Sequence, residues 1–240
     1  APQILRVARP GEFVMIKGWQ EFDPLLPRPF SFARIGVEQD TFDLFYKVVG
    51  RGTELMSGWK PGDSVTVLGP LGHAWPLPDE KRDVVIVGRG LGIAPMVCLA
   101  EEAAKRGLRV FSYLSGRNKT VMLGSDILEK LSYRYVEALD GQTSVALVTE
   151  YLEADLQAGL LERPCFYTCG SKRLALHLQE LEKRYDADAF ISLETHMACG
   201  FGACKGCVHP MVDPQAEDGF VYERVCLEGS VFPLKKVLFL

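Results

Sequence analysis

Hydrophobic residues in the first third of the chain fall into short runs separated by turn-forming residues. Four runs between residues 11 and 77 have the length of a β-strand: Phe13–Ile16, Phe30–Ala33, Phe42–Val49 and Ser64–Leu68. Glycine, proline and aspartate between them, as in Pro61-Gly62-Asp63, mark positions where the chain reverses. Short strands joined by tight turns predict an antiparallel β barrel or sandwich.

The pattern changes at residue 84, where a strand and helix order begins and then recurs. Val84–Val87 is an uninterrupted β-branched run, as expected for a strand buried on both faces of a parallel sheet. The other expected elements are strands at Arg109–Leu114, Tyr135–Ala138 and Phe166–Cys169 and helices at Ala94–Arg106, Glu150–Gln157 and Lys172–Tyr185. Alternating strands and helices predict an α/β domain.

After Phe190 the regular pattern gives way to a segment rich in glycine and cysteine, Cys199–Cys207, followed by a strand-like run, Phe220–Cys226. So short a segment cannot build a regular core, and we expect a metal centre to organise it. The three patterns divide the chain into a β barrel over residues 1–80, a parallel α/β domain over 81–191 and a small metal-centred module over 192–240.

Composition excludes several classes of protein. The 240 residues are 48% hydrophobic with a formal net charge of −4, which excludes intrinsic disorder. The most apolar stretch, Val84–Ala100, is interrupted by Arg89 and is too short to cross a membrane. Scattered basic residues in an acidic chain give no surface for nucleic acid. Because Ala1–Pro10 lacks the order of a secretory signal, we expect a cytoplasmic protein.

Four of the seven cysteines have the spacing Cys199-x4-Cys204-x2-Cys207-x18-Cys226. This is the plant-type [2Fe–2S] pattern, in which a tight loop wraps the cluster and a distant thiolate completes it. The alternative is a structural zinc site on the same four cysteines, but such sites favour paired C-x2-C knuckles and this chain has one. The cysteines Cys98 and Cys165 are expected in the core.

Glycines follow the first strand of the α/β domain as Gly88-x-Gly90-x-Gly92, and Pro95 lies in the first turn of the next helix. A glycine turn between a strand and a helix suits nucleotide phosphates. The alternative is a tight turn without a ligand, because Ile93 departs from the full G-x-G-x-x-G motif.

The expected barrel carries two basic turns. One is Arg28-Pro29-Phe30-Ser31, and the other spans Tyr46-Lys47 and Gly50–Thr53. Together with the helix start at Pro95 they are suited to a dinucleotide, although an arginine before proline is also common on ordinary surfaces.

Six segments of the chain resemble, in the same order, the family of electron-transfer subunits of bacterial dihydroorotate dehydrogenase, within the ferredoxin-reductase superfamily. They are RPFS (28–31), LFYKVVGRGT (44–53), PGDSVTVLGPLG (61–72), VGRGLGIAPM (87–96), YTCG (167–170) and ETHMACGFGACKGCVHP (194–210). The resemblance covers nearly the whole chain. It implies an FAD-binding barrel, a nicotinamide-nucleotide domain and a [2Fe–2S] module.

The resemblance also implies site residues. Those expected to contact FAD are Arg28, Pro29, Phe30, Ser31, Phe45, Tyr46, Lys47, Gly52 and Thr53. Those expected at the nicotinamide nucleotide are Gly88, Gly90, Gly92, Pro95 and Gly170, with Cys169 as the catalytic residue or, alternatively, a packing residue. Cys199, Cys204, Cys207 and Cys226 are expected to hold the cluster.

The implied function is electron transfer between NAD(H) and a separate, flavin-containing dehydrogenase subunit of pyrimidine biosynthesis, within a hetero-oligomer. Alternatives are a reductase for another acceptor, such as an oxygenase component or a bifurcating transhydrogenase, and a zinc-binding scaffold without activity. We expect the partner to dock on the cluster loop through Phe201, Val208, Pro210 and Met211.

Two departures from the family stand out. Relatives usually have three consecutive glycines where this chain has Gly88-Arg89-Gly90, so Arg89 either crowds the nicotinamide or grips a phosphate. The chain also begins close to the Pro10-Gly11 turn, short of the family's usual first strand, so that strand is either reduced or missing from this sequence.

Overall fold

The computed structural model describes residues 2–20, 22–36, 38–78, 82–142 and 147–239. Its N-terminal part is rich in β-structure, as the pattern predicts. After a short helix, α1 (Pro2–Leu5), three antiparallel strands form a sheet in the order β2 (Arg28–Ser31), β1 (Phe13–Lys17) and β5 (Thr66–Leu71). A separate hairpin joins β3 (Arg34–Gly36) to β4 (Thr41–Asp43).

The strand expected over Phe42–Val49 is wrong for most of its length. β4 ends at Asp43, the next residues are neither strand nor helix, and α2 (Arg51–Ser57) follows. Phe45 packs against the core beside α3, and its ring lies within 3.0 Å of the position a Cβ on Gly124 would take. This tertiary contact draws the segment away from the sheet and overrides its local β-propensity.

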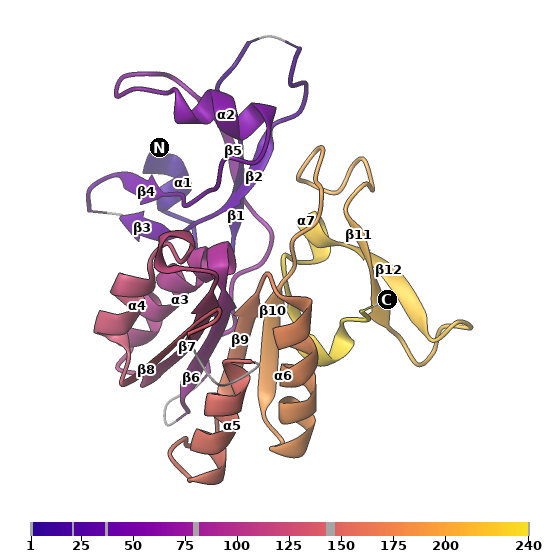
Figure 1. Cartoon of the computed structure of the whole chain (residues 1–240). Helices are drawn as coiled ribbons and strands as arrows, with labels where there is room; N and C mark the ends of the chain where they lie inside the picture. The colour runs from indigo at the N-terminus through magenta and orange to yellow at the C-terminus, as the bar shows by residue number, and fades with distance from the viewer. Residues whose placement is uncertain (1, 21, 37, 79–81, 143–146, 240) are drawn as a thin grey trace.

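A six-stranded sheet forms the centre of the molecule (Figure 1). Its strand order is β13 (Val231–Pro233), β10 (Asp188–Ser192), β9 (Cys165–Cys169), β6 (Val84–Arg89), β7 (Val110–Gly116) and β8 (Arg134–Leu139). All neighbours are parallel except β13, which pairs antiparallel with β10 at the edge.

Helices cover both faces of this sheet. The pair α3 (Ala94–Lys105) and α4 (Ser125–Leu131) contributes to one core, and α5 (Thr149–Gln157) and α6 (Lys172–Arg184) contribute to the other. Within β6, Val84 and Ile86 belong to the first core and Val85 and Val87 to the second. The uninterrupted β-branched run is therefore buried on both faces, as predicted.

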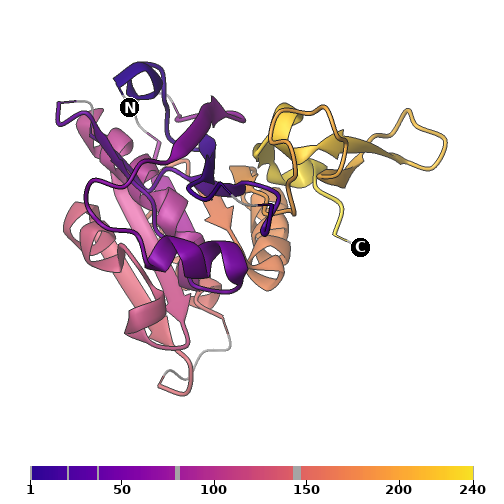
Figure 2. The same cartoon turned by 90° about the horizontal axis from the view of Figure 1, so that it is seen from above.

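The C-terminal segment stands to one side of the sheet in both views (Figures 1 and 2). It contains the hairpin β11 (Val208–Val212) and β12 (Phe220–Arg224), and then α7 (Val225–Glu228). Met211, Val225 and Leu234 are buried in the same core as α5 and α6. This module is therefore held by apolar packing against the core of the α/β domain, in addition to any metal centre.

Short 3-10 turns complete the fold at Gly90–Ile93, Lys119–Val121 and Leu234–Lys236. None of the helices in the described ranges combines the length and the apolar character required to cross a membrane.

Candidate functional site

A cavity of about 450 Å³ lies where the N-terminal strands, the glycine turn and the start of the C-terminal segment meet. Three separate stretches that the sequence singled out line it together. The predicted residues among its lining are Arg28, Pro29, Phe30, Ser31, Phe45, Tyr46, Lys47, Thr53 and Pro95. The fold thus collects nearly all of the expected FAD contacts around one cavity.

Gly52 is an exception, because it does not line this cavity. A Cβ on Gly52 would lie 2.6 Å from Nε of Arg28, so the glycine makes room for the arginine side chain. Arg28 also lies over the ring of Trp19 at 5.7 Å and donates from Nη1 to the carbonyl of Leu26 at 2.6 Å. Gly52 therefore acts through the position of Arg28.

The turn expected at Gly50–Thr53 is the start of a helix. α2 begins at Arg51, and Oγ1 of Thr53 accepts hydrogen bonds from the amides of Val49 at 3.0 Å and Gly50 at 3.3 Å. The hydroxyl fixes the chain entering α2 at the edge of the cavity.

The C-terminal side of the cavity consists of residues that sequence reasoning did not assign to it. They are Ser192, Leu193, Glu194, Thr195, His196, Met197 and Ser230. Ser192 is the last residue of β10, residues 193–197 follow it, and Ser230 precedes β13. The hydrophobic pattern did not reveal β10. In the described part of the chain, Oγ1 of Thr195 is buried without a hydrogen-bond partner. An orphaned hydroxyl beside a cavity fits a polar ligand such as the flavin ring.

Cys169 lies at the end of β9, and its fully buried thiol donates to Oε1 of Glu194 at 3.8 Å. Burial raises the pKa of this thiol well above its usual value, with a further contribution from the Glu194 carboxylate. The thiol is therefore protonated at neutral pH. Of the two residues Glu194 lines the cavity, and Cys169 lies behind it.

Gly88 at the end of β6 and Gly90 and Gly92 in the turn after it have different surroundings. A Cβ on Gly92 would lie 2.4 Å from the carbonyl oxygen of Cys169, and one on Gly88 would lie 2.9 Å from Ile93. Gly170, with φ +85°, lies against Gly92 in the same junction. Gly90, with φ +57° and open space around it, lines a cavity of about 440 Å³ together with Tyr46 and Lys47.

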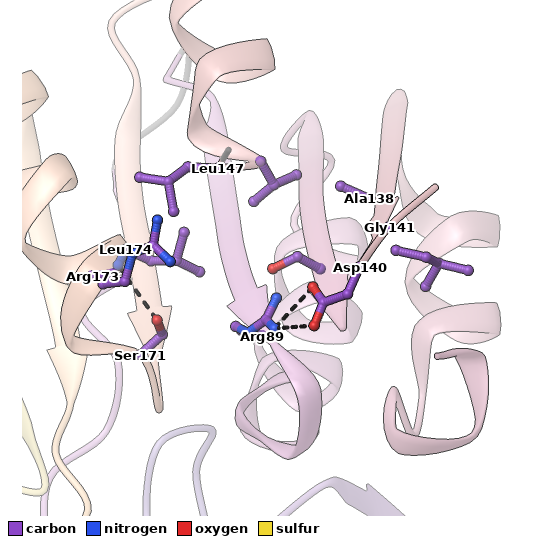
Figure 3. Close-up of a pocket in the computed structure, with 11 residues that line it drawn as sticks. Arg89, Ala138, Asp140, Gly141, Leu147, Ser171, Arg173 and Leu174 are labelled. Atoms are coloured by element: carbon purple, nitrogen blue, oxygen red, sulfur yellow. Dashed lines mark hydrogen bonds and ion pairs between the residues drawn. The ribbon is translucent and has the colours of Figure 1, made fainter. Parts of the chain in front are cut away.

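A third cavity, of about 390 Å³, lies along the carboxyl ends of β6, β7 and β8 (Figure 3). Arg89 points across it and donates from Nη2 to Oδ1 of Asp140 at 2.9 Å and to Oδ2 at 2.7 Å. The hydrogen bond from Arg89 lowers the pKa of this carboxyl. Arg89 does not line the 450 Å³ cavity, but it also lines the 440 Å³ cavity beside Gly90.

The four clustered cysteines accept hydrogen bonds from backbone amides. Gly202 donates to Cys226 at 3.1 Å and Gly206 donates to Cys204 at 3.5 Å. Two of the cysteines also act as donors: the amide of Cys204 reaches Cys199 and that of Cys226 reaches Cys207, each at 3.4 Å. Gly200 and Gly202 have positive φ, which turns their amides into the loop.

Amide donors stabilise thiolates, so this loop fits the sulfur ligands of a cluster. Burial raises the pKa of Cys199, but the amides of Cys204, Phe201 and Ala203 outweigh it and lower that pKa to about 6. Burial raises the pKa of Cys226 to about 12. Among the described residues, no three His, Cys, Asp or Glu side chains converge on a single-ion site.

Two other expectations are tested by burial. Cys98 and Cys165 are buried, as predicted, and burial raises their pKa values to about 12 and about 11. The expected docking face is only partly correct. Phe201 and Val208 are exposed, but Pro210 and Met211 are buried, and Met211 belongs to the core that α5 and α6 also form.

The chain is similar to known proteins over nearly its full length. Residues 194–238 match the family model of the iron–sulfur cluster binding domain of dihydroorotate dehydrogenase B. The electron transfer subunits of dihydroorotate dehydrogenase B (NAD(+)) from Bacillus cereus and Bacillus anthracis are each 35% identical to it over 98% of this chain and 89% of theirs. The solved structure of an NADH-dependent reduced ferredoxin–NADP oxidoreductase shares the fold, with a TM-score of 0.83, 24% identity and coverage of 99% of this chain and 82% of that one.

Proposed function

The chain belongs to the family of electron transfer subunits of dihydroorotate dehydrogenase B, and we propose that it carries electrons between NAD(H) and a separate flavin-containing dehydrogenase subunit. The proposal assigns FAD to the 450 Å³ cavity and a [2Fe–2S] cluster to Cys199, Cys204, Cys207 and Cys226. The observation that carries it is the convergence of three distant sequence segments on that one cavity.

FAD supplies the conversion between two-electron and one-electron transfer that neither nicotinamide nor an iron–sulfur cluster can perform alone. The chain's own residues bind and orient the groups. Arg28 brings a cation to one end of the cavity, while the rings of Phe30 and Tyr46, with centroids 5.7 Å apart, form an aromatic wall. The orphaned hydroxyl of Thr195 gives a hydrogen-bonding group on the opposite, C-terminal side.

The Cys169–Glu194 contact holds a proton beside the cavity. The buried thiol stays protonated and directs its hydrogen to Oε1 of Glu194, so the carboxylate is oriented by the end of β9. Since Gly92 and Gly170 pack at the same junction, the space above them is where the nicotinamide ring can approach the flavin cavity. This arrangement supports a positioning role for Glu194 and Cys169 in hydride transfer.

The cluster loop packs directly on the flavin part of the molecule. A Cβ on Gly200 would lie 2.5 Å from the side chain of Met15 in β1, and the residues leading into the loop line the flavin cavity. Electrons therefore have a short path from the flavin cavity to the cluster loop. Cys204 is exposed, so the loop also reaches the surface where a partner would accept electrons.

The test is anaerobic co-expression of this chain with a candidate dehydrogenase subunit, followed by flavin, iron and zinc analysis. We expect FAD and two irons per chain, flavin bleaching by NADH, and NAD(+) reduction by dihydroorotate only with the partner present. Cys226→Ser should lower the iron content, with Cys98→Ser as the matched control. Zinc without iron, or no flavin, would contradict the proposal.

We further propose that the protein works in the cytoplasm. Its seven cysteines are all unpaired, including the three buried outside the cluster loop, which suits a reducing compartment. Cell fractionation with antibody detection tests this location.

A further inference from the structure

The ion pair between Arg89 and Asp140 has no part in the electron path described above. We propose that this pair sets the nucleotide specificity of the site, and that Arg89, by neutralising Asp140, allows a 2′-phosphorylated nucleotide such as NADPH to bind as well as NADH. The inference rests on the proposed nicotinamide-nucleotide function.

The position of the pair follows from the strand order. The sheet runs β9-β6-β7-β8, so the connections from β6 and β9 depart in opposite directions and the junction between these two strands is a topological switch point. Ligands of open α/β sheets bind outside the carboxyl ends of the strands at such a point. Gly92 and the carbonyl of Cys169 meet there.

With the nicotinamide half of the dinucleotide at this junction, the adenosine half extends along the same carboxyl edge of the sheet. The 390 Å³ cavity lies in that direction, with lining residues from β7, from β8 and from the start of α6 (Figure 3). β8 is two strand spacings, or about 10 Å, from β6. Asp140, which follows β8, therefore lies where the adenosine ribose is expected.

A carboxylate at the ribose accepts a hydrogen bond from the 2′-hydroxyl and repels a 2′-phosphate, whereas a nearby arginine accommodates the phosphate. This chain has both groups, bound to each other. Nη2 of Arg89 contacts both oxygens of Asp140, at 2.9 and 2.7 Å. Their side chains are 40% and 48% exposed, so an incoming nucleotide can reach either of them.

The side chains around the Arg89–Asp140 pair carry a net positive charge. Arg173 lines the cavity from α6, and Asp140 is the only carboxylate among the described lining residues. Arg117, which lines the neighbouring cavity, also acts on Asp140 and lowers its pKa. Three arginines therefore lie in or next to this cavity, against one carboxylate among its described lining residues. The excess positive charge suits a dianionic phosphate in addition to the diphosphate of the nucleotide.

The test measures binding of two nucleotide fragments, 5′-AMP and adenosine 2′,5′-bisphosphate, to the flavin-loaded chain by calorimetry. The wild-type protein should bind both with similar affinity. Arg89→Ala should weaken bisphosphate binding roughly tenfold or more and change 5′-AMP binding by less than about threefold. Asp140→Asn should strengthen bisphosphate binding. Arg106→Ala, which removes a surface arginine paired with Glu102 on α3, is the matched control.

The same variants are then compared for flavin bleaching by NADH and NADPH, and the ratio of the two rates should follow the binding ratio. An unchanged ratio in Arg89→Ala, or exclusion of the bisphosphate by wild type while 5′-AMP binds, overturns this inference and leaves the proposed function intact. Failure of both fragments to bind the wild-type protein overturns the nucleotide site itself.

Discussion

At the residue scale, Arg28 illustrates how one glycine controls the position of a charged side chain. Arg28 can occupy its site only because Gly52, at the start of α2, has no Cβ; an added methyl would lie 2.6 Å from Nε. The segments RPFS (28–31) and LFYKVVGRGT (44–53) identified these two residues, but a sequence motif cannot separate a direct ligand contact from an indirect one.

We predict that Gly52→Ala displaces Arg28 and weakens FAD retention. A charge-assisted contact to phosphate contributes about 1.5 to 3 kcal/mol, so complete loss would lower affinity about tenfold or more, and partial displacement less. Flavin fluorescence titration of the apoprotein measures the change. Gly58→Ala is the control, because a Cβ there meets only the carbonyl of Leu55 at 3.5 Å. Equal flavin affinity in the two variants would show that Arg28 does not hold the cofactor.

Glu182 is a second residue that gives a testable prediction, here for the pH dependence of folding stability. Burial raises its pKa from 4.5 to about 7, with partial relief from the amide of Ala189 and from Lys235. Because the folded-state pKa is above the unfolded one, the group favours folding below pH 4.5, and this contribution is lost as the pH rises to about 7.

Glu182→Gln should therefore be more stable than the wild-type protein above pH 7, by roughly 1 to 2 kcal/mol after screening, and similar to it near pH 4. Urea unfolding at both pH values measures the difference. Glu180→Gln, on the exposed side of the same helix, is the control substitution. A variant less stable than wild type at pH 8 would mean that the carboxylate is paired in the native state.

At the scale of elements, sequence periodicity predicted the strands and helices that are defined by their burial. It missed elements whose structure depends on contacts with other parts of the chain. The strand β6 was recognisable because both of its faces are buried. The helix α2 was not, because its start is a glycine-rich turn sequence whose helical geometry depends on Thr53. β10 went unrecognised since its run is short and merges with the cluster segment, and for this reason Glu194 was not assigned to the flavin cavity.

The turn between β6 and α3 gives a prediction that separates packing from ligand binding. Gly92→Ala forces a Cβ into the carbonyl of Cys169, so it should destabilise the fold by roughly 3 kcal/mol or more. A Cβ added at Gly90 has open space around it. Gly90→Ala should therefore destabilise the fold only through the strain of an alanine in the left-handed conformation, by roughly 1 to 2 kcal/mol. Thermal unfolding ranks the two variants, and NADH binding by the folded Gly90→Ala protein reports on the cavity. Equal stability of the two would show that β9 and the turn can separate.

At the scale of the whole molecule, the sequence predicted the three kinds of local architecture, and the structure adds how they meet. The flavin cavity takes residues from the N-terminal sheet, from the start of α3 and from the end of β10. No periodicity signals such a meeting point, because each segment follows its own local pattern. The cysteine motif was different, because its plant-type spacing is recognisable from the sequence alone.

Apolar side chains remain exposed around the cluster loop, although Pro210 and Met211 are buried. Phe201 is 53% exposed, Leu227 43% and Tyr222 61%. Phe201 lies inside the loop that carries Cys199 and Cys204. An apolar surface beside the exposed Cys204 is suited to a partner that must approach closely to accept electrons.

We therefore predict that Phe201→Asp weakens assembly with the dehydrogenase subunit at least tenfold while leaving flavin and iron content unchanged, because a charge at the centre of an apolar interface must be desolvated without a partner. Size-exclusion chromatography of the co-expressed subunits measures assembly, and absorbance spectra report the cofactors. Val7→Asp, at a 60% exposed position after α1, is the control and should assemble normally. If Phe201→Asp assembles as well as the control, the partner contacts another face and electrons leave the cluster by a different route.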